Sequence, residues 1–386
     1  METLHQSPTD PAFVQDPYPF YARARATGDL ILWQDYGLVC ATSHAAVHAL
    51  LRDRRMGREA PPESAPPVPD HLAPFYALEA HSMLELEPPR HTRLRRLVTR
   101  AFTSARIAAL APDITALTNG LIDTFPDTPF DLLPAFANRI PVITICRLLG
   151  VPEAMADQLL SWSHDMVAMY MAGRTRAMED AAATAATDFA AFMRGYIDSR
   201  RSDPRDDLIT HLIAAEEAGD HLTTDELITT CILLLNAGHE ATVHAMGNAV
   251  KCLLEQGLPP SDAAIEETLR FDPPLHMFTR FAYEDVTAFG HTFRRGDQVG
   301  LLLASANRDP AQWPEPDRFD PARKAATNHS FGGGLHFCVG APLARLELQI
   351  ALPILFTRRP GLRLASPPTY SDSYHFHGLT RLMVET

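Results

Sequence analysis

The sequence predicts a mainly α-helical protein with a small β-sheet region. Segments with the 3.6-residue period of a helix dominate the chain, at residues 105–123, 154–171, 181–200 and 224–256. Shorter runs rich in β-branched and aromatic residues occur near residues 30–41, from 281 to 303 and at the C-terminal end. Turn signals at Gly290-His291 and at Arg295-Gly296-Asp297 divide the second of these runs into hairpin-like strands.

Composition and charge are those of a globular protein without a nucleic-acid or membrane partner. The 386 residues are 46% hydrophobic and 21% charged, and the formal net charge is −13. This charge opposes binding to nucleic acid or to an anionic membrane. The N-terminal residues are polar and interrupted by proline, with neither a signal-peptide pattern nor a long apolar span. We therefore expect a cytoplasmic protein that is not anchored in a membrane.

The cysteines predict neither a disulfide framework nor a zinc ribbon. There are five of them, an odd number, and no two stand in a C-x-x-C pair.

A proline-rich stretch at residues 61–74 predicts a loop. It holds six prolines in fourteen residues, too many for a helix or a central strand. Composition does not shift across it, which favours a surface lid over a pocket above a domain linker.

Residues 223–257 predict one unusually long helix. Thr223 and Glu226 form a capping-box pattern, and Gly257 supplies the stop. The middle of the helix changes from apolar residues to the small and polar run Ala-Gly-His-Glu-Ala-Thr at 237–242. Because such residues are costly at the centre of a core helix, we expect this run to contact a cofactor or a substrate, with a water-filled kink as the alternative.

A glycine-rich segment with one cysteine precedes the last predicted helix. It runs from Phe331 to Gly340 and contains Gly332, His336 and Cys338. Consecutive glycines let the backbone approach a flat or bulky group closely, and the N-terminal dipole of a helix favours a thiolate. From these residues alone, a buried and inert cysteine in a glycine-rich turn is the alternative.

This segment resembles, position by position, the haem-binding signature of the cytochrome P450 family: Phe, two glycines, one or two variable residues, a basic residue, one more residue, Cys and then Gly. The resemblance extends over nearly the whole chain, from Asp16-Pro17-Tyr18-Pro19 through residues 306–310 to the C-terminal β turn. It implies a helical triangular prism with a minor β region, formed by a single haem domain over residues 1–386 without a fused reductase. It also implies haem b (iron protoporphyrin IX) between the long helix and the helix after Cys338, with Cys338 as the thiolate ligand of the metal.

Further haem contacts are implied by the same resemblance. The two propionates of haem need cationic or donor side chains in an otherwise apolar slot. His91 and Arg95 resemble the family's H-x-x-x-R pair, although without the resemblance they would be taken as a solvated helix face. The expected cofactor contacts are His91, Arg95, Ala237, Arg280, Phe331, Gly332, His336, Cys338 and Gly340.

Glu267 and Arg270 look like the E-x-x-R element of the family, which closes a buried acid-arginine network behind the haem. Without the resemblance, this i,i+3 pair would be a weak surface contact. We expect the third member of the network within residues 307–319, where Arg308 and Arg318 are the two candidates.

Residues 237–242 resemble the family's oxygen-activation segment, in which an acid is followed at once by Thr. Glu240 occupies the acid position, but Ala241 replaces the alcohol, and Thr242 lies one residue on, about 100° around the helix. These three residues are the catalytic candidates. Because oxygen activation needs a proton, we expect either a water held by Glu240 or a hydroxyl of the substrate to supply it.

The resemblance implies a monooxygenase that inserts one oxygen atom of O2 into a small, mostly apolar organic substrate. Electrons from NAD(P)H would arrive through a separate ferredoxin and ferredoxin reductase. Two alternatives are a peroxide-driven oxygenase and a non-catalytic haem-thiolate protein that binds a ligand. By family position, the substrate pocket is expected to include Met83, Leu275, Met277, Phe278 and His375.

A zinc protease is excluded by helix geometry. His239, Glu240 and His244 stand on one predicted helix, but the zinc pattern needs histidines at i and i+4. These two are at i and i+5, about 140° apart around the helix axis. We expect His239 to be a polar residue satisfied inside the helix packing.

Overall fold

The computed structural model describes residues 1–217, 222–324 and 326–386, and helices build most of the molecule. The α-helices are α1 (Pro11–Gln15), α2 (Tyr18–Thr27), α3 (His44–Leu50), α4 (Ala73–Glu79), α5 (Arg90–Ala101), α6 (Ser104–Ala109), α7 (Ala111–Asp123), α8 (Arg139–Leu149), α9 (Ala156–Val167), α10 (Arg176–Arg201), α11 (Leu208–Glu217), α12 (Thr224–Gln256), α13 (Asp262–Phe271), α14 (Leu303–Ala306) and α15 (Ala341–Arg358).

The strands of the described residues form four small sheets. The largest has the order β1-β2-β3-β9-β6-β4 and mixes parallel and antiparallel pairs. The others are β10-β13-β5 and the two-stranded sheets β11-β12 and β7-β8. The strands are β1 (Glu2–Leu4), β2 (Leu30–Trp33), β3 (Leu38–Ala41), β4 (Met56–Gly57), β5 (Phe130–Asp131), β6 (Met277–Ala282), β7 (Val286–Ala288), β8 (His291–Phe293), β9 (Gln298–Leu302), β10 (Arg363–Leu364), β11 (Thr369–Tyr370), β12 (Leu379–Arg381) and β13 (Met383–Glu385).

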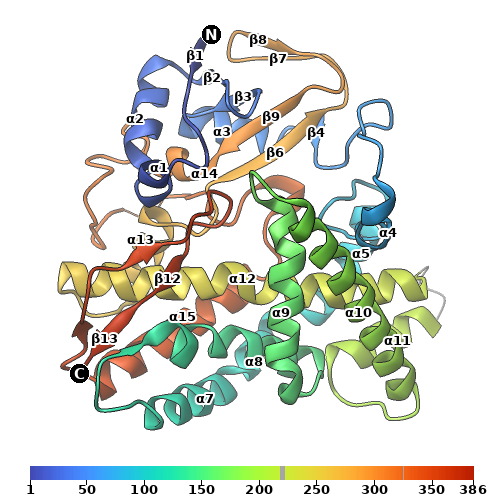
Figure 1. Ribbon diagram of the computed structural model, residues 1–386, viewed down its shortest axis with the longest axis vertical. Helices are drawn as coiled ribbons and strands as arrows, with labels where there is room; N and C mark the ends of the chain where they lie inside the picture. The colour runs from blue at the N-terminus through green and yellow to red at the C-terminus, as the bar shows by residue number, and fades with distance from the viewer. Residues whose placement is uncertain (218–221, 325) are drawn as a thin grey trace.

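Figure 1 shows the largest sheet gathered at one end of the molecule and most helices at the other, with α12 crossing the full width between them. Helix α12 contacts α8, α9, α10, α13 and α15. The predicted mainly helical fold with a small β region is confirmed.

The apolar core is divided along α12 into two clusters. Residues 227–235 of its N-terminal half pack into one cluster with α8, α9 and α10. Residues 245–253 of its C-terminal half pack into a second cluster with α13 and α15. Between these two stretches of α12 lies the small and polar run at 237–242, which supplies no member of either apolar cluster.

The ends of α12 follow the sequence pattern. The Thr223 hydroxyl accepts a hydrogen bond from the Glu226 backbone N–H, and the Glu226 carboxylate accepts one from the Thr223 N–H. Gly257 ends the helix with φ of 62°, a left-handed conformation that glycine adopts without strain.

Several expected elements differ from the structure in their bounds. The segment 154–171 corresponds to α9, Ala156–Val167, and the segment 181–200 to α10, Arg176–Arg201. The segment 105–123 forms two helices, α6 and α7, because Pro112 lies in the first turn of α7 and lacks the N–H that would continue α6. The proline-rich loop ends earlier than expected, since Pro74 lies in the first turn of α4, where a missing N–H costs nothing.

Candidate active site

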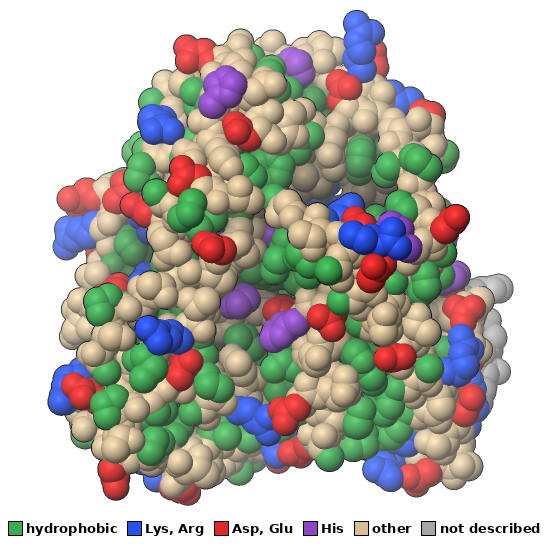
Figure 2. All heavy atoms as spheres, in the orientation of Figure 1, with side chains coloured by type: hydrophobic (Ala, Val, Ile, Leu, Met, Phe, Trp, Pro, Cys, Tyr) green, Lys and Arg blue, Asp and Glu red, His purple; other side chains and the backbone are tan. Residues whose placement is uncertain are grey.

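A cavity of about 300 Å³ lies beside the middle of α12. Its walls come from α12, from the segment around Cys338 with the start of α15, and from residues 75–102, Leu275, Phe278, His375 and Phe376. Figure 2 shows one face of the molecule hollowed between its strand-rich end and the helices below, with Lys or Arg and His side chains at the rim.

At its middle, α12 presents small residues to the cavity, after larger apolar residues such as Leu233. Ala237, Gly238 and Ala241 all line it. Gly238 also faces α8, where an added Cβ would lie 2.8 Å from the Ile145 side chain. The short side chains therefore leave a broad apolar space beside an unbroken helix, and no kink is needed.

Cys338 lines the same cavity, just before α15 begins. Burial raises the pKa of its thiol, although the backbone N–H groups of Gly340 and Ala341 and the positive charges of Arg95 and Arg345 oppose that rise. The helix N-terminus alone therefore does not make this sulfur a thiolate. A metal cation bound to the sulfur would make it a thiolate, because metal coordination deprotonates a thiol outright.

Basic side chains converge on one edge of the cavity. His91, Arg95, His336 and Arg58 line it. The ring centroids of His91 and His336 lie 4.4 Å apart. The buried Nδ1 of His91 has no hydrogen-bond partner among the described residues. Burial and the nearby positive groups lower the pKa of His91 to about 4. Such an unmatched basic edge suits anionic groups of a bound molecule.

Glu87 is an acid at this edge that the sequence analysis did not single out. Its Oε1 lies 2.8 Å from Nε2 of His336 and accepts a hydrogen bond of 2.8 Å from the Arg58 backbone N–H. One nitrogen of His336 is thus already held by a carboxylate, whereas no acid among the described residues pairs with His91 or Arg95 in this way.

Glu240 lies among three histidines. Its buried carboxylate lines the cavity, and its Oε1 lies 3.2 Å from Nε2 of His164 on α9 and 3.6 Å from Nε2 of His239. Its Oε2 lies 3.9 Å from Nε2 of His244. Burial would raise the pKa of Glu240, but the three histidines outweigh it and lower the pKa below its ordinary value. His239 Nδ1 also lies 2.6 Å from the Leu235 carbonyl, inside the helix packing.

Most of the residues predicted for the site come together at the cavity, and three do not line it. Arg280 is buried on β6, where its Nη1 donates to the Thr279 carbonyl at 2.7 Å. Met277 turns toward the other face of the sheet and packs on Cys40 and its neighbours. Gly332 lies behind Phe278. The predicted residues that line the cavity are Met83, His91, Arg95, Ala237, Glu240, Ala241, Thr242, Leu275, Phe278, Phe331, His336, Cys338, Gly340 and His375.

A polar group at the cavity wall was missed from the sequence. Tyr170 donates to Glu79 at 3.4 Å and stacks on His375 with ring centroids 5.4 Å apart. Burial and the neighbouring Glu85 raise the pKa of Glu79 to about 8. No motif marks these residues, because they come from separate elements that meet only in the fold.

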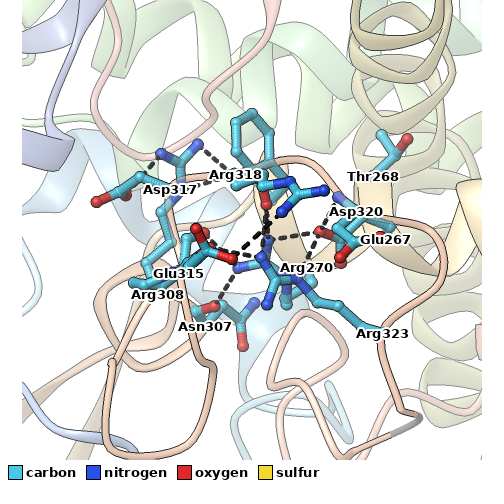
Figure 3. Close-up of polar contacts among 12 residues, drawn as sticks. Glu267, Thr268, Arg270, Asn307, Arg308, Glu315, Asp317, Arg318, Asp320 and Arg323 are labelled. Carbon is cyan, nitrogen blue, oxygen red and sulfur yellow. Dashed lines mark hydrogen bonds and ion pairs between the residues drawn. The ribbon is translucent and has the colours of Figure 1, made fainter. Parts of the chain in front are cut away.

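The acid-arginine network has a different third member from the one predicted (Figure 3). Arg270 donates to both oxygens of Glu267, at 2.8 and 2.7 Å. The third member is Arg323, whose Nε donates to Glu267 Oε1 at 3.0 Å. Arg308 instead pairs with Asp317, and Arg318 pairs with Glu315 at the surface.

The prediction of Arg308 or Arg318 was therefore wrong. The chain between 307 and 319 supplies backbone carbonyls to the network, including those of Asn307 and Pro316, which accept from Arg270. The side chain that reaches Glu267 comes from beyond that range, after the chain has turned back.

The residues present fit a haem. A flat apolar macrocycle suits the small face of α12, a soft metal-binding sulfur opens into the same space, and an incompletely paired basic edge suits two carboxylates. All five cysteines are free thiols, and Cys338 is the one at the cavity.

Comparison with known proteins agrees with this fit. The cytochrome P450 family model matches residues 255–358. The chain is 38% identical to vitamin D(3) 25-hydroxylase of Pseudonocardia autotrophica, over 96% of this chain and 94% of that protein. It is 36% identical to the cytochrome P450 monooxygenase PikC of Streptomyces venezuelae, over 92% of this chain and 87% of that one.

Solved structures extend the similarity to the whole fold. The structure of P450BioI in complex with an acyl carrier protein ligated to hexadec-9Z-enoic acid superposes with a TM-score of 0.91 at 33% identity, over 97% of this chain and 99% of that one. The tirandamycin C-bound monooxygenase TamI gives 0.86 at 35% identity, over 99% of both chains.

Fold and similarity together define the class of protein, an enzyme of the haem-dependent monooxygenases. The chain belongs to the cytochrome P450 family. Membership implies haem as the cofactor and O2 as a reactant. Among the described helices, none combines the length and apolar character needed to cross a bilayer.

Proposed function

We propose that this protein holds haem through Cys338 and oxygenates a small apolar molecule bound beside α12. The observation that carries this proposal is that the Cys338 sulfur and the acid segment of α12, Glu240 to Thr242, open into one cavity. Haem, when bound there, supplies the activation of dioxygen. His91 and Arg95 bind its propionates, with His336 held in place beside them by Glu87.

Glu240 and His164 carry the proton. Ala241 offers no hydroxyl, so the acid itself must hold the water that gives up the proton. His164 is 57% exposed at its side chain and lies 3.2 Å from the buried Glu240 carboxylate. A proton taken from solvent by His164 reaches Glu240 in one transfer and the cavity in the next. This route favours protonation by a water held by Glu240 over protonation by the substrate.

The substrate is an organic molecule that is mostly apolar and has a polar group at one end. Phe75, Met83, Leu233, Leu275 and Phe278 supply apolar wall, which favours burial of hydrocarbon. Tyr170, Glu79 and His375 form the polar patch at the same wall. A substrate hydroxyl or carbonyl placed there would leave the apolar remainder of the molecule against the apolar wall.

Electrons come from NAD(P)H through a separate ferredoxin and ferredoxin reductase. Product formation with this donor system and O2, and a much lower yield with hydrogen peroxide alone, is the expected result for a monooxygenase. A higher yield with peroxide alone would identify a peroxide-driven oxygenase instead. Haem binding without turnover in either assay would identify a ligand-binding protein.

The carbon monoxide difference spectrum of the reduced protein tests the proposal. We expect the red-shifted Soret band of thiolate-ligated haem, and its loss in Cys338→Ser. Cys252→Ser, a change at a buried cysteine away from the cavity, is the matched control and should leave the band unchanged. A band that survives in Cys338→Ser would overturn the ligand assignment.

A further inference from the structure

Three histidines meet outside the cavity lining. His44 and His48 stand four residues apart on α3, and His329 comes from the segment that leads to Cys338. One ring nitrogen of each lies within 4.8 Å of those of the other two. The ring centroid of His329 lies 4.6 Å from that of His44 and 5.4 Å from that of His48. None of the three lines the cavity.

His329 has a buried ring that the described residues leave without a partner. Its side chain is fully buried, and neither Nδ1 nor Nε2 has a hydrogen-bond partner there. Leaving a buried polar nitrogen unpaired destabilises a folded protein, so such a group in a native structure needs a reason. A cation bound between the rings supplies one.

Unlike His329, His44 and His48 each have one ring nitrogen in contact with another polar group. His44 Nε2 lies 3.1 Å from the Thr327 carbonyl, the contact that commonly orients a metal-ligating histidine and leaves Nδ1 free to bind. His48 Nδ1 lies 3.1 Å from Arg52 Nη1. Arg52 is exposed and also donates to the His48 carbonyl, so it can leave the ring and let the histidine rotate.

We propose that His44, His48 and His329 bind one divalent transition-metal ion of the zinc class, with water completing the coordination. Imidazole nitrogen suits this class, and three histidines with one open position form a known type of zinc site. Histidines at i and i+4 stand about 40° apart on a helix, close enough to share one ion. Zinc to nitrogen distances of about 2.0–2.1 Å put ligand nitrogens about 3.4 Å apart, so the rings close on the ion by side-chain rotation.

The site joins two parts of the molecule. The end of α3 packs directly on the glycine-rich segment before Cys338, since a Cβ at Gly334 would lie 2.3 Å from the Leu51 carbonyl. The backbone N–H of His329 donates to Asn307 at 2.7 Å, and the Asn307 carbonyl accepts from Arg270 of the acid-arginine network. A bound ion therefore ties α3 to the segment that carries Cys338, and it stabilises the folded protein.

Zinc binding to the haem-loaded, untagged protein tests the proposal independently of its enzymatic function. The measurements are equilibrium dialysis against zinc chloride with metal analysis, and the midpoint of thermal unfolding. We expect one equivalent of zinc per chain. At a zinc concentration of 100 Kd, the midpoint should rise by about 3 °C, given the unfolding entropy of a chain of this length.

The variant is His44→Gln with His48→Gln, because both side chains are partly exposed and their loss leaves the buried His329 in place. The control is His211→Gln with His291→Gln, two histidines outside the cluster. The site is supported if the His44/His48 double variant no longer binds the equivalent of zinc and the His211/His291 double variant still binds it. Equal binding by both pairs, or only weak binding without a defined stoichiometry in the unchanged protein, overturns it. An unchanged carbon monoxide spectrum shows that the variant is folded.

Discussion

Replacing Arg323 by Met removes the third member of the acid-arginine network while keeping much of the side-chain bulk. The Nε of Arg323 donates to Glu267 at 3.0 Å, and its Nη2 donates to the carbonyls of Glu315 and Arg318 at 2.5 and 2.7 Å. The side chain is 11% exposed, and Glu267 is 4% exposed. The substitution therefore leaves a buried carboxylate with one arginine in place of two.

The expected loss follows from these contacts. A hydrogen bond to a charged group contributes about 1.5–3 kcal/mol, and the carbonyl contacts add less because water replaces part of them. Since Arg270 still compensates Glu267, we expect the free energy of unfolding to fall by about 2–4 kcal/mol. For a chain of 386 residues, the entropy of unfolding is about 0.8 kcal/mol per degree, so the midpoint falls by about 2–5 °C.

Thermal unfolding followed by circular dichroism and by the haem Soret band measures this loss. Arg318→Met is the matched control, because Arg318 has a 63% exposed side chain and, among the acids of the described residues, pairs with Glu315 alone. Its substitution should change the free energy of unfolding by less than about 0.5 kcal/mol. If Arg318→Met lowers the midpoint as much as Arg323→Met does, the assignment of the third member is wrong.

Three further predictions concern buried acids. Glu240→Gln should lower the rate of product formation about 100-fold with substrate binding unchanged, and His164→Gln should lower it less, as measured with a substrate found by Soret titration. Burial raises the pKa of Glu347 well above its ordinary value, so its carboxyl is neutral and Glu347→Gln should change the urea unfolding free energy at pH 7 by less than about 1 kcal/mol. Burial of Asp272 is outweighed by Lys251 and the other positive groups around it, which hold its pKa far below the ordinary range. Its contribution is present above the unfolded pKa of about 4 and is lost as pH falls toward the folded pKa, so Asp272→Asn should cost about 3–5 kcal/mol at pH 7 and progressively less below pH 4.

Each of the three predictions on buried acids has an outcome that would contradict it. Unchanged turnover in the Glu240 variant would remove that carboxylate from the proton route. A loss of several kcal/mol in Glu347→Gln would mean that this carboxyl is ionised. A gap between Asp272→Asn and the unchanged protein that stays constant down to pH 3 would mean that the carboxylate contributes through shape and not through charge.

The sequence by itself determined the elements whose signals are local. The capping box at Thr223 and the stop at Gly257 bound α12 as predicted, because each needs only residues three or four positions apart. The glycine-rich run before Cys338 is also a local signal, and its resemblance to the haem-binding signature indicated the family to which the chain belongs. The segment 237–242 was recognised as unsuited to a core, and it does lie between the two apolar clusters.

Only the tertiary structure decided which distant side chains meet. Arg323 reaches Glu267 because the chain turns back after residue 319, whereas the sequence analysis had considered Arg308 and Arg318 for that place. His164 reaches Glu240 through the packing of α9 on α12, and His329 reaches α3 across 281 residues of chain. Long side chains pair with whatever the packed backbone brings within about 4 Å, and this is a property of the assembled elements that no local pattern encodes.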